Sequence, residues 1–203
     1  LMLIEKPVIA RVNGDAIGRE ARNSQPYIEQ LFMLRPQGMD EETFERLLYR
    51  VRRRTENEIA NSEIEDKESF YVPSCSCRTI VYKGLMLAPQ IERFYFELAN
   101  PLVTSALALV HQRFSTNTFP SWKLAHPYRY VAHNGEINTI RGNISWMNAR
   151  QSVLKSDLYN GQIDDLFPVI VPEGSDSASL DNAVEFLYQS GRSLPHVMAM
   201  LIP

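Results

Sequence analysis

The chain has 203 residues, and its 21 Lys and Arg against 24 Asp and Glu give a formal net charge of −3. Hydrophobic residues make up 44% and charged residues 22%, which excludes a disordered chain, and the acidic balance argues against a dedicated nucleic-acid binder. No apolar run approaches the roughly 18 residues of a membrane span. The length predicts one domain over residues 1–203, and the apolar ends predict that this domain is truncated at both termini.

The two cysteines, Cys75 and Cys77, are separated by a single residue. A small secreted scaffold carries more cysteines, so we expect a reducing compartment: the cytoplasm, or a plastid if the source is a plant or alga. Their spacing is too short for an unstrained disulfide, and the four histidines show no metal-finger spacing. We therefore interpret both residues as plain strand cysteines and predict no metal site.

The first half of the chain alternates short strands with one long helix. The strands are apolar or alternating runs that end at turn signals such as Asn13-Gly14, and Asp40 is placed to cap the long helix. The predicted elements, in chain order, are strands at 8–12 and 28–34, a helix at 41–61, strands at 70–72 and 79–82, and a short helix at 89–96.

The long helix has an apolar face and a strongly basic segment. Apolar residues recur at three- and four-residue intervals, at Phe44, Leu47, Leu48 and Val51. The basic run at 50–54 (Arg-Val-Arg-Arg-Arg) then falls mainly on the other face, mixed with glutamates. We expect these arginines to lie on a solvated face rather than to bind phosphate.

The second half of the chain adds short strands and three helices. The helix at 177–190 has the clearest apolar periodicity, Gly191 ends it, and Pro195 is favourable for the start of another. Interspersed helices and short strands favour an α+β sandwich over a doubly wound parallel sheet. The predicted elements are strands at 106–114 and 128–132, a helix at 139–154, a strand at 169–171, and helices at 177–190 and from 195 onward.

Three segments are polar where the periodicity would place apolar residues. Arg113 follows an apolar strand and suits bidentate binding of a carboxylate. The Asn134 side chain and the Gly135 backbone N–H can point at one developing negative charge, as in an oxyanion hole. Asp176 lies in a Ser-rich turn, where its carboxylate can accept hydrogen bonds from an ammonium group. Together these residues predict a site that holds an α-amino acid at both ends.

Each of these segments also has a purely structural interpretation. Asn134-Gly135 is the commonest signal for a hairpin turn, and Ser175 can cap the following helix. Arg113 can belong to a structural ion pair. The residues alone leave these alternatives open.

Five motifs, densest between 111 and 190, resemble the class II glutamine amidotransferase domain of glutamate synthases. They are GREAR at 18–22, CRTIVYKG at 77–84, RFSTN at 113–117, HNGEINT at 133–139 and EGSDS at 173–177. Asn-Gly-Glu alone would fit any class II amidotransferase, whereas the full set in this order is specific.

The resemblance implies the N-terminal-nucleophile fold, a four-layer αββα sandwich of two antiparallel sheets between helices. It also implies that L-glutamine is hydrolysed to glutamate and ammonia. By this resemblance, Arg113 binds the glutamine α-carboxylate with help from Thr116. Asn134 and Gly135 form the oxyanion hole, and Asp176 holds the α-ammonium group.

The nucleophile of this family is a cysteine at the mature N-terminus, whose free α-amino group is the base for its own thiol. This chain begins with Leu1, and the backbone nitrogens of Cys75 and Cys77 are amides without a basic lone pair. We therefore expect an internal fragment that lacks the catalytic cysteine and is inactive alone.

For the parent protein, the resemblance implies glutamate biosynthesis and ammonia assimilation, with ammonia passed inside the protein to 2-oxoglutarate at a flavin site. We expect FMN and an iron–sulfur cluster in the parent and no cofactor in this fragment. The expected partners are L-glutamine, the rest of the glutamate synthase chain and a small electron-transfer subunit, without nucleic acid or membrane. The alternatives are an amidotransferase for another acceptor and a non-catalytic glutamine- or glutamate-binding module.

Overall fold

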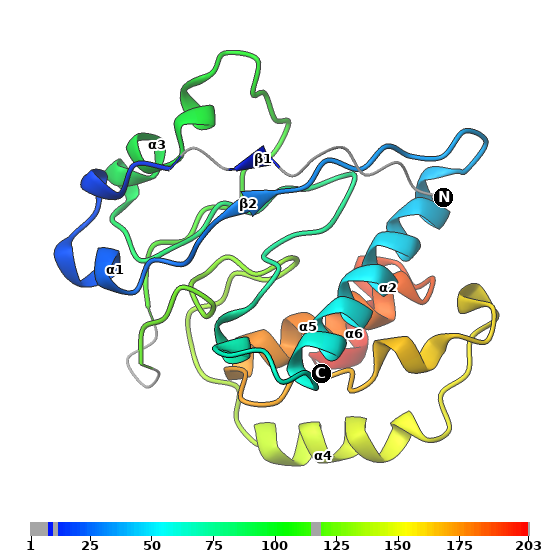
Figure 1. Ribbon diagram of the computed structural model, residues 1–203. Helices are drawn as coiled ribbons and strands as arrows, with labels where there is room; N and C mark the ends of the chain where they lie inside the picture. The colour runs from blue at the N-terminus through cyan, green and yellow to red at the C-terminus, as the bar shows by residue number, and fades with distance from the viewer. Residues whose placement is uncertain (1–7, 10–11, 115–118, 203) are drawn as a thin grey trace.

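The computed structural model describes residues 8–9, 12–114 and 119–202. The α-helices are α1 (Arg19–Asn23), α2 (Glu41–Ala60), α3 (Ile91–Phe94), α4 (Ile140–Gln151), α5 (Asp176–Gln189) and α6 (Leu194–Leu201). Figure 1 shows α2, α4, α5 and α6 gathered in one part of the molecule and α1 and α3 in another, with long extended segments between them.

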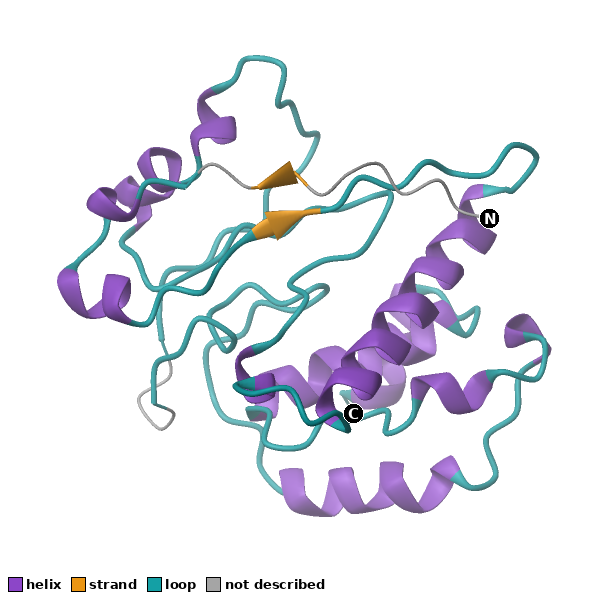
Figure 2. Ribbon diagram, viewed as in Figure 1, coloured by secondary structure: helices purple, strands orange, loops and turns teal. Residues whose placement is uncertain are grey.

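Much of the remaining chain is loop, as Figure 2 shows. Strands β1 (Val8–Ile9) and β2 (Glu29–Gln30) pair antiparallel and form the single sheet found in the described ranges. None of the described helices is both long and apolar enough to cross a membrane. Short 3₁₀ helices occur at Gly14–Ala16, Lys67–Ser69, Ala88–Gln90, Phe96–Ala99, Asp157–Tyr159 and Ile163–Leu166.

The long helices form where the sequence predicts them. Asp40 caps α2, because its Oδ1 accepts a hydrogen bond from the Thr43 N–H at 2.9 Å. The predictions for α4, α5 and the start of α6 are confirmed to within about three residues, the usual uncertainty of a helix boundary. The helix predicted at 89–96 is shorter, with α3 between two 3₁₀ turns.

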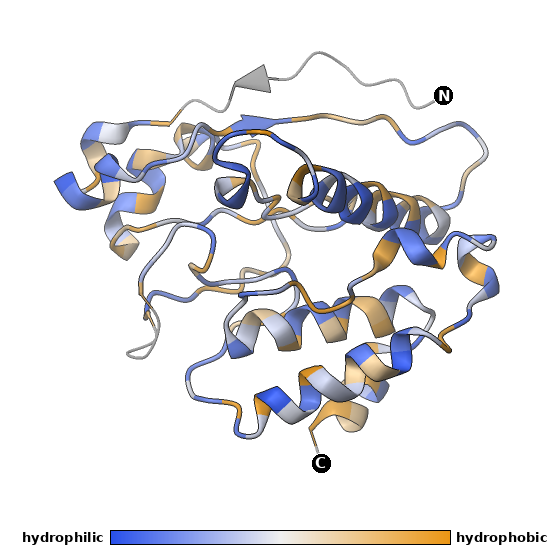
Figure 3. Ribbon diagram, turned by 60° about the horizontal axis from the view of Figure 1, so that its bottom comes forward, coloured by the Kyte–Doolittle hydropathy of each residue, from blue (hydrophilic) through white to orange (hydrophobic). Residues whose placement is uncertain are grey.

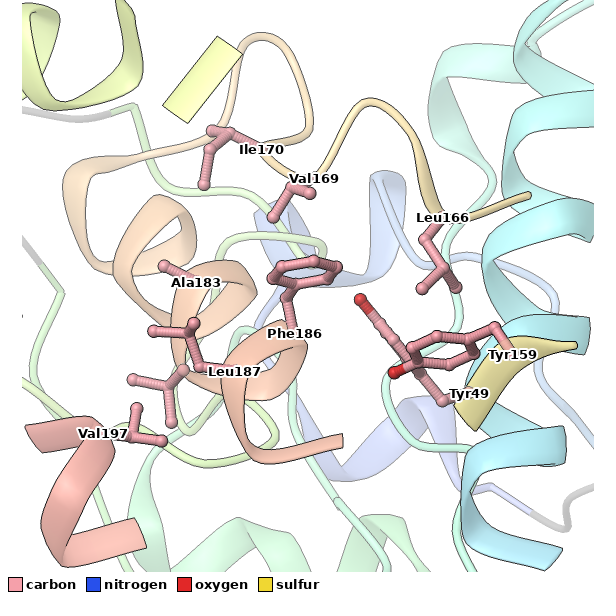
Figure 4. Packing of buried hydrophobic residues seen from close by; sticks show 10 residues of the cluster. Tyr49, Tyr159, Leu166, Val169, Ile170, Ala183, Phe186, Leu187 and Val197 are labelled. Carbon is pink, nitrogen blue, oxygen red and sulfur yellow. The ribbon is translucent and has the colours of Figure 1, made fainter. Parts of the chain in front are cut away.

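The main hydrophobic core lies around α5. Figure 4 shows Phe186 of α5 between Val169 and the aromatic rings of Tyr49 and Tyr159. Val197 of α6 packs into the same cluster and is fully buried. Figure 3 shows that α6 is largely hydrophobic, whereas α2 is hydrophilic along much of its length. A second, smaller cluster contains Ile17, Phe94, Tyr95 and Trp122.

The prediction that the arginines of α2 lie on a solvated face is wrong for Arg52 and Arg53, which are 3% and 2% exposed. Arg52 donates to Glu185 of α5 at 2.5 Å and to Glu56 at 2.8 Å. Arg53 also donates to Glu56 at 2.8 Å. The periodicity of α2 could not show this, because the carboxylate of Glu185 is 133 residues away along the chain. We call the following residues the charge cluster: Arg52, Arg53, Glu56, Arg129, Asp181 and Glu185.

The structure also corrects the strand predictions. In the described residues, the runs at 8–12 and 28–34 contribute the two-residue strands β1 and β2 and isolated bridges, such as that of Val12 with Tyr95. No ladder forms at 70–72, 79–82, 106–114, 128–132 or 169–171. Side chains take the backbone donors that a partner strand would use: the N–H groups of Tyr130 and Val131 donate to Asp181, at 2.7 and 3.1 Å. The predicted two-sheet sandwich is therefore not observed among the described residues.

One loop segment, residues 102–110, presents several apolar side chains to solvent. Leu102, Leu107 and Val110 are 85%, 84% and 77% exposed. Monomeric proteins seldom expose a contiguous apolar run of this kind, and an extended one invites pairing with another strand.

Candidate active site

The residues predicted to bind an amino acid come together around one cavity of about 400 Å³. Arg113, Asn134, Gly135 and Asp176 all line it. Thr116, the remaining predicted binding residue, lies outside the described residues. The volume lies within the usual range of small-molecule sites. The other lining residues are Phe114, Phe119, Leu124, His126, Tyr128, His133, Glu136, Ser175 and Ser177.

The first turn of α5 places the carboxylate of Asp176 in this cavity. Its two oxygens accept hydrogen bonds from the N–H groups of Ile137 and Ser177, at 2.8 and 2.6 Å. Ser175 caps the helix, because its Oγ accepts from the Ala178 N–H at 3.1 Å. The structural interpretation of Ser175 is thus confirmed, and capping by Ser175 leaves Asp176 available to a ligand.

His111, to which the sequence analysis gave no role, orients the side chain of Asn134. Its Nδ1 accepts from the Arg113 N–H at 3.3 Å, so the ring proton lies on Nε2. Nε2 lies 2.7 Å from Asn134 Oδ1 and donates to it. The amide N–H groups of Asn134 then face away from His111, which leaves them for an anion. The only sequence signal was the position of His111 two residues before Arg113, because no pattern links it to Asn134.

Gly135 adopts a backbone conformation that other residues rarely tolerate. Its φ is +148°, and a Cβ atom there would lie 3.3 Å from Nε2 of His133. Within the described residues, no hydrogen bond uses the Gly135 N–H. The peptide is thus free to act with the Asn134 amide on one negatively charged atom.

Two imidazole rings, those of His126 and His133, line the cavity. The rings of His111 and His126 stack with centroids 4.4 Å apart, and His126 packs edge-on against Tyr128. Burial, together with the nearby His111 and Lys83, lowers the pKa of His126 to about 4, so its ring is neutral at pH 7. The lining residues with formally charged side chains are then Arg113, Glu136 and Asp176.

Neither cysteine lines this cavity. Burial raises the pKa of the Cys75 thiol to about 11, and burial together with a hydrogen bond to Glu45 raises the pKa of the Cys77 thiol to about 11. Few thiolates are present at neutral pH under these conditions. Cys75 and Cys77 are therefore poorly placed and poorly activated as nucleophiles for this site.

The comparisons with known proteins place this chain in a family. The model of the glutamine amidotransferases class-II family matches residues 8–203. The chain belongs to the class II glutamine amidotransferases.

The curated proteins described below, to which this chain is similar, are glutamate synthases. It is 45% identical to the glutamate synthase [NADPH] large chain of Bacillus subtilis (strain 168), over 95% of this chain and 12% of that protein. It is 45% identical to ferredoxin-dependent glutamate synthase 2 of Synechocystis, again over 95% of this chain and 12% of the relative. It is 43% identical to glutamate synthase [NADH] of Saccharomyces cerevisiae, over 97% of this chain and 9% of the relative. The chain thus spans about one eighth or less of the length of these relatives.

Proposed function

We propose that this chain is the glutamine-hydrolysing part of a glutamate synthase. The observation that carries the proposal is the shared cavity, in which Arg113 and Asp176 offer opposite charges beside the donors of Asn134 and Gly135. Arg113, with Thr116, binds the α-carboxylate of L-glutamine, and Asp176 binds its α-ammonium group. The carboxamide then lies toward Asn134 and Gly135.

The reaction requires a nucleophile that we place outside residues 1–203, at a mature N-terminal cysteine of the natural gene product. Its thiolate attacks the carboxamide carbon, and the Asn134 and Gly135 donors stabilise the oxyanion. The C–N bond breaks, and the protonated nitrogen leaves as ammonia. Water then hydrolyses the thioester, which releases glutamate and restores the thiol. Residues 1–203 alone are accordingly inactive.

Replacement of Gly135 by Ala tests the oxyanion hole. The added Cβ meets the His133 ring and strains a peptide held at a φ of +148°, so the Gly135 N–H moves from its position. We expect the kcat for glutamine hydrolysis by the natural gene product to fall by roughly 100-fold, the usual loss for one oxyanion donor. Gly142→Ala is the matched control, because a Cβ at Gly142 meets nothing within 4 Å. Equal rates for the two variants would contradict the assignment.

The assignment of the nucleophile is tested with the double variant Cys75→Ser/Cys77→Ser. Because both thiols lie outside the cavity, we expect the natural gene product to keep its rate of glutamine hydrolysis within about twofold. Loss of glutaminase activity in a variant that keeps the wild-type melting temperature would show that one of these cysteines is required.

The chain has too few cysteines to hold an iron–sulfur cluster by the usual four ligands. An iron–sulfur cluster takes four cysteine ligands in most proteins, and the chain has only two cysteines. We propose that an iron–sulfur cluster and FMN are held by other parts of the natural protein, where ammonia is added to 2-oxoglutarate. The further partners are then the rest of that chain and a small electron-transfer subunit, in the cytoplasm or in a plastid.

Family membership also supports the four-layer αββα sandwich for the natural protein. The exposed apolar side chains of residues 102–110 support it too, because strand pairing and packing on a second layer would bury them.

A further inference from the structure

Lys83 is a buried lysine that the proposed reaction does not use. Its residue is 6% exposed, and Nζ donates to the carbonyl oxygen of Lys123 at 2.8 Å. Nζ also faces the rings of Tyr128 and Tyr71, with 5.0 and 5.5 Å to their centroids. A buried amine with one hydrogen bond is costly, so its position calls for a role beyond packing.

The surroundings of Lys83 compensate its charge only weakly. Within the described residues, no carboxylate lies within salt-bridge distance of Nζ. Burial lowers the pKa of Lys83 to about 7, the positive charges of Arg129 and Lys123 act in the same direction, and Asp181 opposes them. The amine therefore changes its charge near neutral pH.

Tyr128 connects this lysine to the candidate active site. Its hydroxyl donates to the Leu124 carbonyl at 3.1 Å, so the Ser175 hydroxyl, 2.9 Å away, donates to the Tyr128 oxygen. Ser175 is the cap of α5, whose first residue is Asp176. The Tyr128 ring thus lies between Lys83 and the hydroxyl that fixes the Asp176 turn.

The same ring also contacts the oxyanion side of the cavity. The edge-on contact between Tyr128 and His126 has centroids 4.6 Å apart, and His126 stacks on His111, which orients Asn134. Tyr128 therefore contacts both Ser175, which caps the Asp176 turn, and His126, which stacks on the ring that orients Asn134. Lys83 is the charged group that lies over the Tyr128 ring.

We propose that Lys83 is a positioning residue for glutamine binding, which acts through Tyr128 on the Ser175–Asp176 turn. The proposal rests on the proposed function of the cavity. The ammonium group of Lys83 attracts the Tyr128 ring by a cation–π interaction and holds its hydroxyl where Ser175 can donate to it. Without that charge, the turn loses its anchor, and Asp176 meets the glutamine ammonium less well.

The test measures KM for L-glutamine of the natural gene product and its Lys83→Met variant between about pH 6 and pH 9. At the lower pH we expect the KM of the variant to exceed that of wild type by about tenfold. At the higher pH wild-type Lys83 is neutral, so the ratio of the two KM values falls toward one. The side chains of His111, His126 and His133 are the same in both proteins, so their effects on KM largely cancel in the ratio.

Two further variants make the outcome decisive. Lys67→Met is the matched control, because Lys67 also donates to a backbone carbonyl but does not contact Tyr128. We expect the KM of the Lys67→Met variant to stay at the wild-type value. The arginine of the Lys83→Arg variant stays charged throughout this pH range. We therefore expect the KM of this variant to stay constant at the higher pH values, where the KM of wild type rises. A KM ratio for Lys83→Met that is the same at every pH, or equal to one throughout, would overturn the proposal. Wild-type protein without any glutaminase activity would instead overturn the proposed function.

Discussion

Replacement of Asp176 by Asn raises the KM for L-glutamine of the natural gene product by roughly 10- to 100-fold, the usual loss for a hydrogen bond to a charged group. The variant keeps the size of the side chain but removes the charge that we propose pairs with the substrate ammonium group. It also replaces one of the two oxygens that accept from Ile137 and Ser177 by an N–H donor, which loosens the turn.

Glu173→Gln is the control for this experiment. Glu173 is exposed, lies three residues earlier and does not line the candidate active site, so its neutralisation leaves KM within about twofold of wild type. If Asp176→Asn and Glu173→Gln have the same small effect on KM, Asp176 does not bind the substrate.

The second large effect concerns stability. Glu56→Gln lowers the free energy of unfolding by about 3–5 kcal/mol, as expected when one partner of a buried ion pair is removed. The carboxylate of Glu56 accepts from Arg52 and Arg53 and lies 3.4 Å from a nitrogen of Arg129. Its replacement by a neutral amide removes the carboxylate that pairs with Arg53 and one of the two that pair with Arg52. Urea unfolding of the wild-type protein and the variant at pH 7 measures the difference.

The pH dependence of stability provides an independent check on the same residue. Burial opposes the charge of Glu56, but Arg52, Arg129 and Arg53 outweigh burial and lower its pKa from 4.5 to about 2. Because the folded-state pKa is the lower one, its contribution of about 3 kcal/mol is complete above about pH 4.5 and is lost as the pH falls toward 2. Glu56→Gln lacks this component of the acid dependence.

Glu58→Gln, two residues further along α2, is the matched control. The Glu58 side chain is 64% exposed and pairs only with the exposed Arg54, so its removal changes stability by less than about 0.5 kcal/mol. A Glu56 variant as stable as the Glu58 variant would show that the charge cluster contributes little to the fold.

Helices could be predicted from the sequence because their signals are local. Asp40 and Ser175 cap α2 and α5, and the apolar period of each helix lies within its own residues. The burial of Arg52 could not be predicted in the same way, because it depends on Glu185, a distant residue on another helix. Apolar periodicity cannot distinguish a solvated arginine from one that meets a carboxylate across an interface.

Strands were less predictable because a strand needs a partner as well as a pattern. The run at 128–132 has the composition of a strand, yet the backbone donors of Tyr130 and Val131 bond to Asp181. Residues 102–110 form a loop, with their apolar side chains exposed and no ladder among the described residues.

The candidate active site was predictable to the extent that its residues lie in motifs. Arg113, Asn134, Gly135 and Asp176 were assigned from motifs, and the structure brings them around one cavity. The role of His111 could not be predicted, because its contact with Asn134 is made only in the folded chain.

We propose that Asp176 recognises the α-ammonium group of glutamine in this cavity. The most direct test compares kcat/KM for L-glutamine with that for glutaramate, which has the same carboxamide and carboxylate but no α-ammonium group. We predict that the natural gene product prefers L-glutamine by at least about 100-fold and that this preference collapses toward one in Asp176→Asn. An equally strong preference for L-glutamine in Asp176→Asn would show that Asp176 does not recognise the α-ammonium group.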